Sequence, residues 1–202
     1  MTIIKKYKYP LGLAFIFVIL SAIVHYGFLD VLDSRVDNWV RGTSRPALSS
    51  FFTLITHLGS VYFISFVTLL ILWHIYRLKI NDRLPYLLLC SSLGCFIVNY
   101  LLKNIVQRPR PPLPHLVAAR GFSFPSGHAM VSMCFYAMVA FILSKTLQER
   151  LYIRLSMYLL ATLIAASRVI LHVHYLSDVI AGLFAGLGLF LYIASFDKTS
   201  VS

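Results

Sequence analysis

Three groups of polar and charged residues interrupt the apolar stretches in the second half of the chain. They are Lys103 and Arg110, then Ser126, Gly127 and His128, and finally Arg168, His174 and Asp178. Ionisable side chains at the ends of membrane helices are costly to desolvate, so those that occur there are candidates for function. The order of the apolar stretches between them puts all three groups at the same membrane face, and we expect them to form one pocket.

Lys103 and Arg110 place two permanent cations near one membrane surface. Arginine presents a planar fork to two oxygens and lysine a compact point charge, so the pair suits a phosphate group. The alternative is that such residues are ordinary flanking residues that bind lipid headgroups. That alternative is the one we favour for Arg108 and Arg120.

The tetrapeptide Pro125-Ser126-Gly127-His128 opens an apolar run. A proline near a helix start, followed by small residues, exposes unpaired backbone N–H groups at the positive end of the helix dipole, which favours anion binding. Gly127 would let the backbone approach a phosphate closely, Ser126 would donate a further hydrogen bond, and His128 would hold a transferable proton. A helix cap with an incidental histidine would give the same four residues.

Arg168, His174 and Asp178 supply a third cation, a nucleophile or base, and a carboxylate four residues after the histidine. Residues i and i+4 are neighbours on a helical turn, so Asp178 would bind one imidazole nitrogen and leave the other lone pair free to attack. The alternative is a buried His–Asp pair with a structural role. His172 would point elsewhere on a helix, and we expect it to have a structural or supporting role.

The composition predicts that membrane helices carry these groups. Of the 202 residues, 59% are hydrophobic and 12% are charged, and the mean hydropathy is +0.80, which is far from a globular composition. A hydrocarbon core about 30 Å thick needs roughly 20 apolar residues per spanning helix. Suitable runs lie at about 10–28, 59–76, 85–106, 126–147, 151–171 and 178–196. We expect an all-α, polytopic integral membrane protein with six transmembrane helices, forming a single membrane domain over residues 1–202.

The first 58 residues combine an apolar run with a mixed segment. The run could be a signal peptide, but we favour a helix because no A-x-A-like cleavage site closes it before Asp30. Residues 29–58 mix charged residues with apolar ones at helical spacing, which predicts an amphipathic segment at the membrane interface. Trp39 would lie at the level of the headgroups, although a surface helix packed on neighbouring spans would show the same pattern.

The basic residues predict an orientation and argue against nucleic-acid binding. The chain has a formal charge of +11, but its basic residues are scattered between apolar runs and form no stripe with interleaved aromatic residues. Six spans put both termini on one side, and more than half of the 18 basic residues lie on that side. The positive-inside rule then places both termini in the cytoplasm and the three polar groups at the extracytoplasmic face of a cell membrane.

Taken together, the three groups resemble the signature of a known family. The patterns are K-x6-R-P from Lys103, P-S-G-H from Pro125 and S-R-x5-H-x3-D from Ser167. They are similar to the three-part signature of the type 2 phosphatidic acid phosphatases, and every specified position is filled in order between residues 103 and 178. The six-span layout extends the resemblance over nearly the whole chain.

The resemblance implies a role for each matching residue. His174 would attack phosphorus, Asp178 would orient it, and His128 would protonate the leaving group. The phosphoryl oxygens would be bound by Lys103, Arg110, Ser126, Gly127 and Arg168. No metal and no cofactor would be required, since three cations and a helix N-terminus can neutralise the charge that develops on the phosphoryl oxygens.

The resemblance also implies a substrate class. The substrate would be the phosphomonoester or diphosphate headgroup of a membrane lipid, cleaved through a phosphohistidine intermediate. The small chain resembles bacterial members of the family that act on phosphatidylglycerophosphate or undecaprenyl diphosphate, and phosphatidate is a third candidate. The expected partners are therefore this lipid and the bilayer, with no nucleic acid.

Two other functions are compatible with the same residues. A metal-dependent membrane hydrolase would need ligands, and those available are His128, His172, His174 and Asp178. Three cations beside a divalent metal would be unfavourable, however. A lipid transporter or scramblase would also be polytopic, but its ionisable residues should lie near the bilayer midplane or along a path. Vanadate-binding haloperoxidases share the signature but are typically soluble.

Overall fold

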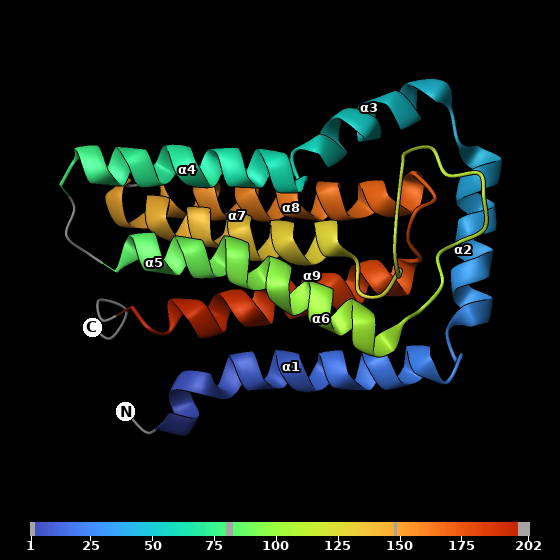
Figure 1. The fold of residues 1–202 in the computed structure, drawn as a ribbon, viewed down its shortest axis with the longest axis horizontal. Helices are drawn as coiled ribbons and strands as arrows, with labels where there is room; N and C mark the ends of the chain where they lie inside the picture. The colour runs from blue at the N-terminus through green and yellow to red at the C-terminus, as the bar shows by residue number, and fades with distance from the viewer. Residues whose placement is uncertain (1–2, 80–82, 148, 198–202) are drawn as a thin grey trace.

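The computed structural model describes residues 3–79, 83–147 and 149–197, and the regular structure in these ranges is all helical (Figure 1). In chain order the elements are α1 (Ile3–His25), α2 (Asp30–Thr43), α3 (Pro46–His57), α4 (Val61–Arg77), α5 (Leu84–Leu89), the π-helical turn η1 (Cys90–Gly94), α6 (Cys95–Val106), α7 (Gly127–Thr146), α8 (Arg150–Ile170) and α9 (Leu176–Ala194). The predicted all-α architecture is confirmed.

Five helical stretches in the described ranges are each long and apolar enough to cross a membrane. They are Tyr7–His25, Leu84–Val106, Gly127–Lys145, Arg150–Ile170 and Leu176–Ala194. A sixth span is formed if α3 and α4, which are bent by 44° at a short break, are counted as one. The apolar run predicted at about 59–76 is therefore a helix, α4, and it makes up the sixth span only if it is counted together with α3.

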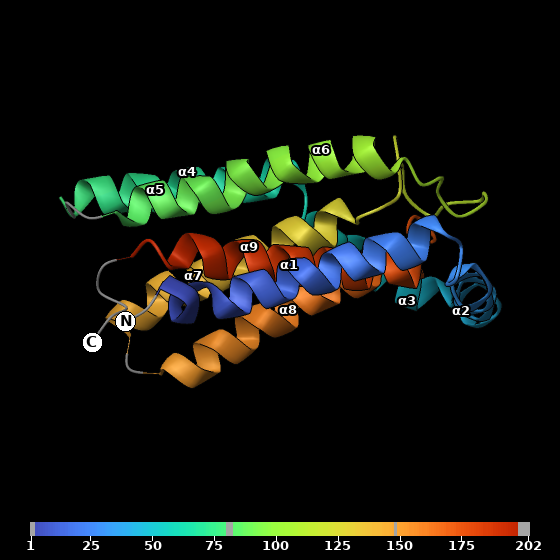
Figure 2. The ribbon, with the colours of Figure 1, turned by 90° about the horizontal axis from the view of Figure 1, so that it is seen from below.

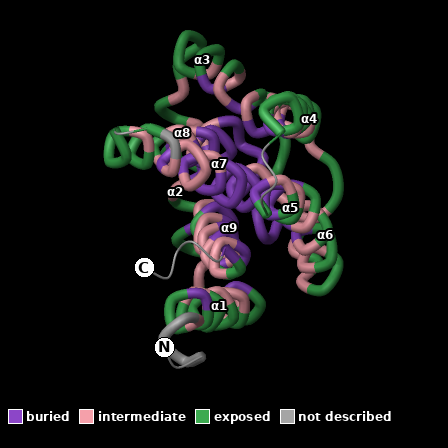
Figure 3. The backbone as a smooth tube through the Cα atoms, turned by 90° about the vertical axis from the view of Figure 1, so that its left-hand side faces the viewer, coloured by how far each residue is buried: buried purple, intermediate pink, exposed green. Residues whose placement is uncertain are grey.

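The central helix of the bundle is α7. Helices α8 and α9 and the span that contains α6 pack around it, and α1 lies further out against α9 (Figure 3). Ala129, Ala137 and Ala140 of α7 are fully buried, because small side chains allow neighbouring helices to approach closely. The outer helices expose large apolar side chains, such as Phe15 at 66% and Tyr62 at 88%, as lipid-facing surfaces require.

Two glycines of α9 bring the start of this helix against the start of α7. A Cβ atom at Gly182 would lie 2.8 Å from the carbonyl oxygen of Ser126, and one at Gly186 would lie 2.2 Å from the carbonyl oxygen of Met130. Both neighbours are backbone atoms, so neither can move aside without shifting the helix. This contact fixes the position of Ser126 relative to α9.

We expect Gly186→Ala to destabilise the protein. The added methyl group would overlap the Met130 carbonyl oxygen, and overpacking a filled interior costs about 1–3 kcal/mol. Thermal unfolding in detergent should therefore begin at a lower temperature than in the wild type. Gly12→Ala in α1 is the matched control, because a Cβ atom there meets nothing within 4 Å. An equal effect of the two substitutions would contradict this account of the helix contact.

The segment predicted to be amphipathic forms two helices, and the first of them, α2, lies crosswise at one end of the bundle. Figure 1 shows α2 along its length and Figure 2 shows it end-on. It packs on α8 and α9. Asp33 and Asp37 are buried, whereas Trp39 is 69% exposed. The helix thus turns its carboxylates toward the protein and part of its apolar face outward.

Candidate functional site

The predicted site residues gather at the end of the bundle where α2 lies (Figure 1). They come from the last turn of α6 (Lys103), the loop after it (Arg110), the start of α7 (Ser126, Gly127, His128), the last turn of α8 (Arg168), the α8–α9 loop (His174) and the first turn of α9 (Asp178). The ionisable members of this set come from six different segments and lie close enough for their charges to interact. The structure therefore brings the three groups together.

His174 and Asp178 are in contact, with Ser123 beside them. The Nδ1 atom of His174 lies 3.5 Å from Asp178 Oδ2 and 3.2 Å from the hydroxyl oxygen of Ser123. That hydroxyl donates its proton to Asp178 Oδ2, so it can only accept from His174. The pattern fits an imidazole with its proton on Nδ1 and its lone pair on Nε2.

The contact between His174 and Asp178 forms at a helix start and not along a helical turn. His174 precedes α9, and Tyr175 has extended backbone angles of φ −72° and ψ 159°. Asp178 lies in the first turn of α9 and folds back, so that its Oδ2 accepts from the Tyr175 amide at 2.9 Å. The i, i+4 contact is present, but the helical geometry that we assumed for it is wrong.

Burial keeps His174 neutral. The residue is 3% exposed, and burial lowers the pKa of His174 to about 3, although Asp178 opposes the shift. A neutral imidazole with a free lone pair is the form that can act as a nucleophile. The Nε2 atom faces Arg110, whose Nη1 donates to it at 3.0 Å.

Neutral backbone carbonyls hold two of the predicted phosphate-binding cations. Lys103 Nζ donates to the carbonyl oxygens of Phe122, at 2.6 Å, and Ser123, at 3.0 Å. Arg110 also donates to three carbonyl oxygens, those of Arg120, Gly121 and Val173. These acceptors fix the two side chains without neutralising their charge, so the charge is available to an anion.

Two predicted phosphate-binding atoms, Ser126 Oγ and Arg168 Nε, are buried and have no hydrogen-bond partner among the described residues. Arg168 is 5% exposed, and its Nη1 donates to Thr56 Oγ1 at 2.6 Å. Ser126 precedes α7, but its side chain caps no backbone amide. Buried donors without a partner are costly, and both of these donors would be satisfied by an oxyanion.

Gly127 and His128 occupy the first turn of α7, each against a neighbouring helix. A Cβ atom at Gly127 would lie 2.9 Å from the side-chain oxygen Oδ1 of Asn99 in α6, so packing also favours glycine here. The half-buried His128 lies against the break between α3 and α4, where a Cβ atom at Gly59 would be 3.1 Å from His128 Cδ2. The approach of a phosphate to the Gly127 amide stays a prediction.

Arg108 is not the flanking residue that we favoured from the sequence. Its side chain is only 9% exposed, and it bonds four side chains, those of Asp30, Asp33, Ser177 and Asp178. That interpretation is therefore wrong, because three carboxylates draw Arg108 into the protein. Arg120, in contrast, is exposed.

His172 points away from His174 and toward α2. Its Nδ1 lies 3.3 Å from Asp37 Oδ1, and its Nε2 lies 3.4 Å from Ser44 Oγ. Within the described part of the chain, no three or more His, Cys, Asp or Glu residues form a group that could hold a metal ion. The ligand set considered for a metal-dependent hydrolase is therefore not assembled by these side chains.

Sequence reasoning missed Ser123 and Thr56, which contact His174 and Arg168. Ser123 lies in an irregular loop and Thr56 near the end of α3, and neither belongs to a charged group or to one of the three patterns. The only available signal for Ser123 was its position two residues before Pro125. That signal does not specify a contact.

Comparison with known proteins gives consistent matches. The family model described as the PAP2 superfamily matches residues 84–201. Phosphatidylglycerophosphatase B of Bacillus subtilis (strain 168) is 31% identical over 194 residues, which cover 94% of this chain and 95% of the relative.

Two crystal structures are also similar. The transmembrane PAP2-type phosphatidylglycerolphosphate phosphatase from Bacillus subtilis has a TM-score of 0.89 and 29% identity, with 96% of this chain and 98% of that chain covered. LpxE from Aquifex aeolicus has a TM-score of 0.66 and 22% identity, with 82% and 96% covered. The second likeness shows a shared fold alone.

Proposed function

We propose, given that this chain belongs to the PAP2 superfamily, that it removes phosphate from a membrane lipid by way of a phosphohistidine at His174. It is a membrane-embedded lipid phosphatase, and the proposal concerns its mechanism, its substrate and its orientation. One observation carries it. The neutral Nε2 of His174 faces Arg110 in a pocket whose buried donors Ser126 Oγ and Arg168 Nε have no partner among the described residues.

The phosphoryl group would be bound by charge and by directed hydrogen bonds. Catalysis of phosphoryl transfer depends mainly on positioning and on neutralising the charge on the equatorial oxygens. The residues proposed to supply these interactions are Lys103, Arg110, Arg168, Ser126 and the amide of Gly127. They allow a reaction that needs no metal ion.

Binding of the substrate would also activate the nucleophile. Arg110 Nη1 donates to the Nε2 lone pair of His174 at 3.0 Å, which blocks attack. A phosphate oxygen is a stronger acceptor for a guanidinium than a neutral imidazole is. We expect the phosphate to take over this donor and so free the lone pair of His174.

Two steps then complete the reaction. His174 Nε2 forms a bond to phosphorus as the bond from phosphorus to the lipid oxygen breaks, and protonated His128 gives its proton to that oxygen. Neutral His128 next takes a proton from water, whose oxygen attacks phosphorus, displaces His174 and releases inorganic phosphate. Asp178 and Ser123 hold Nδ1 and stabilise the positive charge of the phosphorylated ring.

An apolar groove of about 620 Å³ between α1, α6 and α9 supports a lipid substrate. Near the site it is lined by Phe17, Leu102 and Met130, and Met130 lies one turn after Gly127. At the other end it reaches Tyr7 and Tyr192. An acyl chain in this groove would bring its headgroup to the phosphate-binding residues.

Basic residues support an orientation with both termini in the cytoplasm and the site at the extracytoplasmic face. At the end of the bundle opposite the site, the helix termini carry Arg77, Lys145, Arg150 and Arg154. The positive-inside rule favours the cytoplasm for this end. Lys103, Arg110 and Arg168, at the site, have a chemical reason to lie on the other face.

Phosphate release by purified protein in detergent, with excess chelator, tests the function. The substrates to compare are phosphatidylglycerophosphate, phosphatidate and undecaprenyl diphosphate. We expect release that resists the chelator and is fastest from phosphatidylglycerophosphate, the lipid in the name of the Bacillus subtilis relative. Loss of release with chelator and its recovery with a divalent metal would favour a metal-dependent hydrolase. No release from any lipid would favour transport.

A further inference from the structure

A buried arginine outside the phosphate-binding set binds the carboxylate that contacts His174. Arg108 Nη1 donates to Asp178 Oδ1 at 2.8 Å and to Ser177 Oγ at 2.7 Å. The guanidinium carbon lies 4.4 Å from the centroid of the Tyr175 ring, within range of a cation–π interaction. The Nη1 atom of Arg108 is therefore bonded to side chains of α9.

The two oxygens of Asp178 have different partners. Oδ2 accepts from Ser123 and from the Tyr175 amide and lies against His174 Nδ1. Oδ1 accepts from Arg108. Because a carboxylate is planar, fixing Oδ1 also fixes the direction in which Oδ2 faces the imidazole. Arg108 therefore shares with Ser123 and the Tyr175 amide in orienting the carboxylate that contacts His174.

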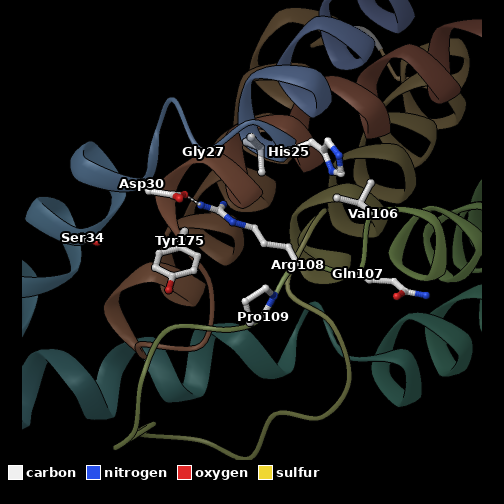
Figure 4. Close-up of a pocket in the computed structure, with 10 residues that line it drawn as sticks. His25, Gly27, Asp30, Ser34, Val106, Gln107, Arg108, Pro109 and Tyr175 are labelled. Atoms are coloured by element: carbon white, nitrogen blue, oxygen red, sulfur yellow. Dashed lines mark hydrogen bonds and ion pairs between the residues drawn. The ribbon is translucent and has the colours of Figure 1, made fainter.

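Helix α2 holds the other side of the guanidinium. Arg108 Nη2 donates to Asp33 Oδ2 at 2.8 Å and to Asp30 Oδ1 at 3.2 Å. Asp33 is 1% exposed and also accepts from the Ser177 amide at 3.0 Å. Figure 4 shows Arg108 reaching toward Asp30 beside the ring of Tyr175, in the wall of a pocket of about 410 Å³. Arg108 thus lines this pocket and also bonds the fully buried Asp178.

The ion pairs of Arg108 with Asp33 and Asp178 depend on its positive charge. Arg108 lies between two buried carboxylates, Asp33 and Asp178. Burial opposes the charge of Arg108, but Asp178 and Asp33 outweigh it and raise the pKa of Arg108. Without this cation, two buried carboxylates would lose their common partner, and each would favour protonation of the other. A protonated Asp178 would no longer stabilise a positively charged His174.

We propose that Arg108 is a positioning residue, which holds Asp178 ionised and aimed at His174, and that Asp33 of α2 in turn positions Arg108. This inference rests on the proposed function, in which His174 is the nucleophile. It assigns α2 a part in assembling the active site, because the contact from α2 to the nucleophile runs through Asp33, Arg108 and Asp178. Asp30 also bonds Arg108, but it is exposed and contributes less than Asp33 to the position of the guanidinium.

Arg108→Gln tests the inference through the split between kcat and KM. We expect kcat to fall about 100-fold, the size of effect produced when a catalytic group is misplaced by about 1 Å, with KM within about twofold of wild type. An unchanged KM would mean that Arg108 does not contribute to binding of the substrate in its ground state. Asp33→Asn should lower kcat less, by about tenfold. The rate of phosphohistidine formation in a single turnover should fall by the same factors.

Arg41→Gln is the matched control for docking of α2. Arg41 also ties α2 to the rest of the protein, through Asp37 and the carbonyl oxygens of Pro112 and Pro114, but it does not contact Asp178. Its kcat should stay within about threefold of wild type. An equal loss of kcat in Arg41→Gln and Arg108→Gln would overturn the inference, because general loosening of α2 would explain both.

Other outcomes separate the inference from the proposed function. An unchanged kcat, or a raised KM alone, in Arg108→Gln would overturn the role of Arg108 and leave His174 as nucleophile. Activity that survives His174→Ala would overturn the proposed function itself. If Arg108→Gln does not fold, Arg108→Lys replaces it. Lysine keeps the charge but cannot bond both carboxylates in the same geometry, so a kcat about tenfold lower with unchanged KM is expected, and wild-type kcat would contradict the inference.

Discussion

Alanine at position 174 should abolish turnover of every lipid substrate while the protein still inserts and folds. His174 is the buried, neutral group whose Nε2 faces Arg110, and no other nucleophile is proposed. Loss of a nucleophile in a covalent mechanism costs on the order of 10⁴-fold or more in kcat. Phosphate release and thermal unfolding in detergent measure the two parts of this prediction.

His172→Asn is the matched control for His174→Ala. His172 has a left-handed backbone with φ 58°, which asparagine tolerates, and the amide can keep a hydrogen bond to Asp37. We expect its kcat to stay within a few-fold of wild type. A loss as large as that in His174→Ala would instead favour a site in which both histidines are ligands of a metal. Substantial turnover by His174→Ala would show that His174 is not the nucleophile.

His128→Ala should impair lipid substrates far more than substrates with a good leaving group. A lipid alkoxide needs a proton as it leaves, and general acid catalysis contributes about 10²–10⁴-fold. Nitrophenolate leaves without a proton, so p-nitrophenyl phosphate should still phosphorylate His174. The second step needs His128 as a base. The variant should therefore release a burst of nitrophenol equal to the number of active sites and then turn over slowly.

The burst separates His128 from the residues that bind phosphate. Arg168→Ala removes a buried cation, one of whose donors, Nε, has no partner among the described residues. This variant should turn over lipid and aryl substrates more slowly to the same extent, and it should give no burst. If His128→Ala behaves in the same way as Arg168→Ala, His128 does not act on the leaving group.

The membrane helices could be predicted from the sequence because the bilayer fixes their length and composition. The apolar run at about 126–147 is α7, Gly127–Thr146, and the run at about 151–171 is α8, Arg150–Ile170. Charged residues at the ends of such runs stand out against an apolar background. Lys103 and Arg168 could therefore be selected as candidates without knowledge of the fold.

The contacts around these candidates could not be predicted, because they join distant parts of the chain. Asp33 and Ser177 are 144 residues apart and are hydrogen-bonded. Ser123 and Arg108 lie in the loop between α6 and α7, where there is no periodicity from which to infer a direction. The contact between His174 and Asp178 was predicted with the wrong geometry, since the sequence does not reveal that it forms across the start of α9 and not within a helical turn.

The orientation of α2 could not be predicted from the sequence either. An amphipathic pattern defines two faces of a helix but not which of them meets the protein. A helix at the membrane interface can turn its apolar face toward the lipid or toward the neighbouring spans. The structure has Asp33 and Asp37 buried and Trp39 exposed, because Arg108 and Arg41 bind the two carboxylates.

The most direct test of the account is to trap the covalent intermediate. Protein mixed briefly with lipid or aryl phosphate labelled with ³²P is quenched in alkaline detergent, digested and analysed by mass spectrometry. We expect one phosphoryl group on His174, stable in alkali and lost in acid. It should be enriched in His128→Ala when the aryl phosphate is the substrate, and absent from His174→Ala with either substrate. The proposed mechanism would be contradicted if the enzyme turned over under these conditions but carried no label at any time, or carried the label on another residue.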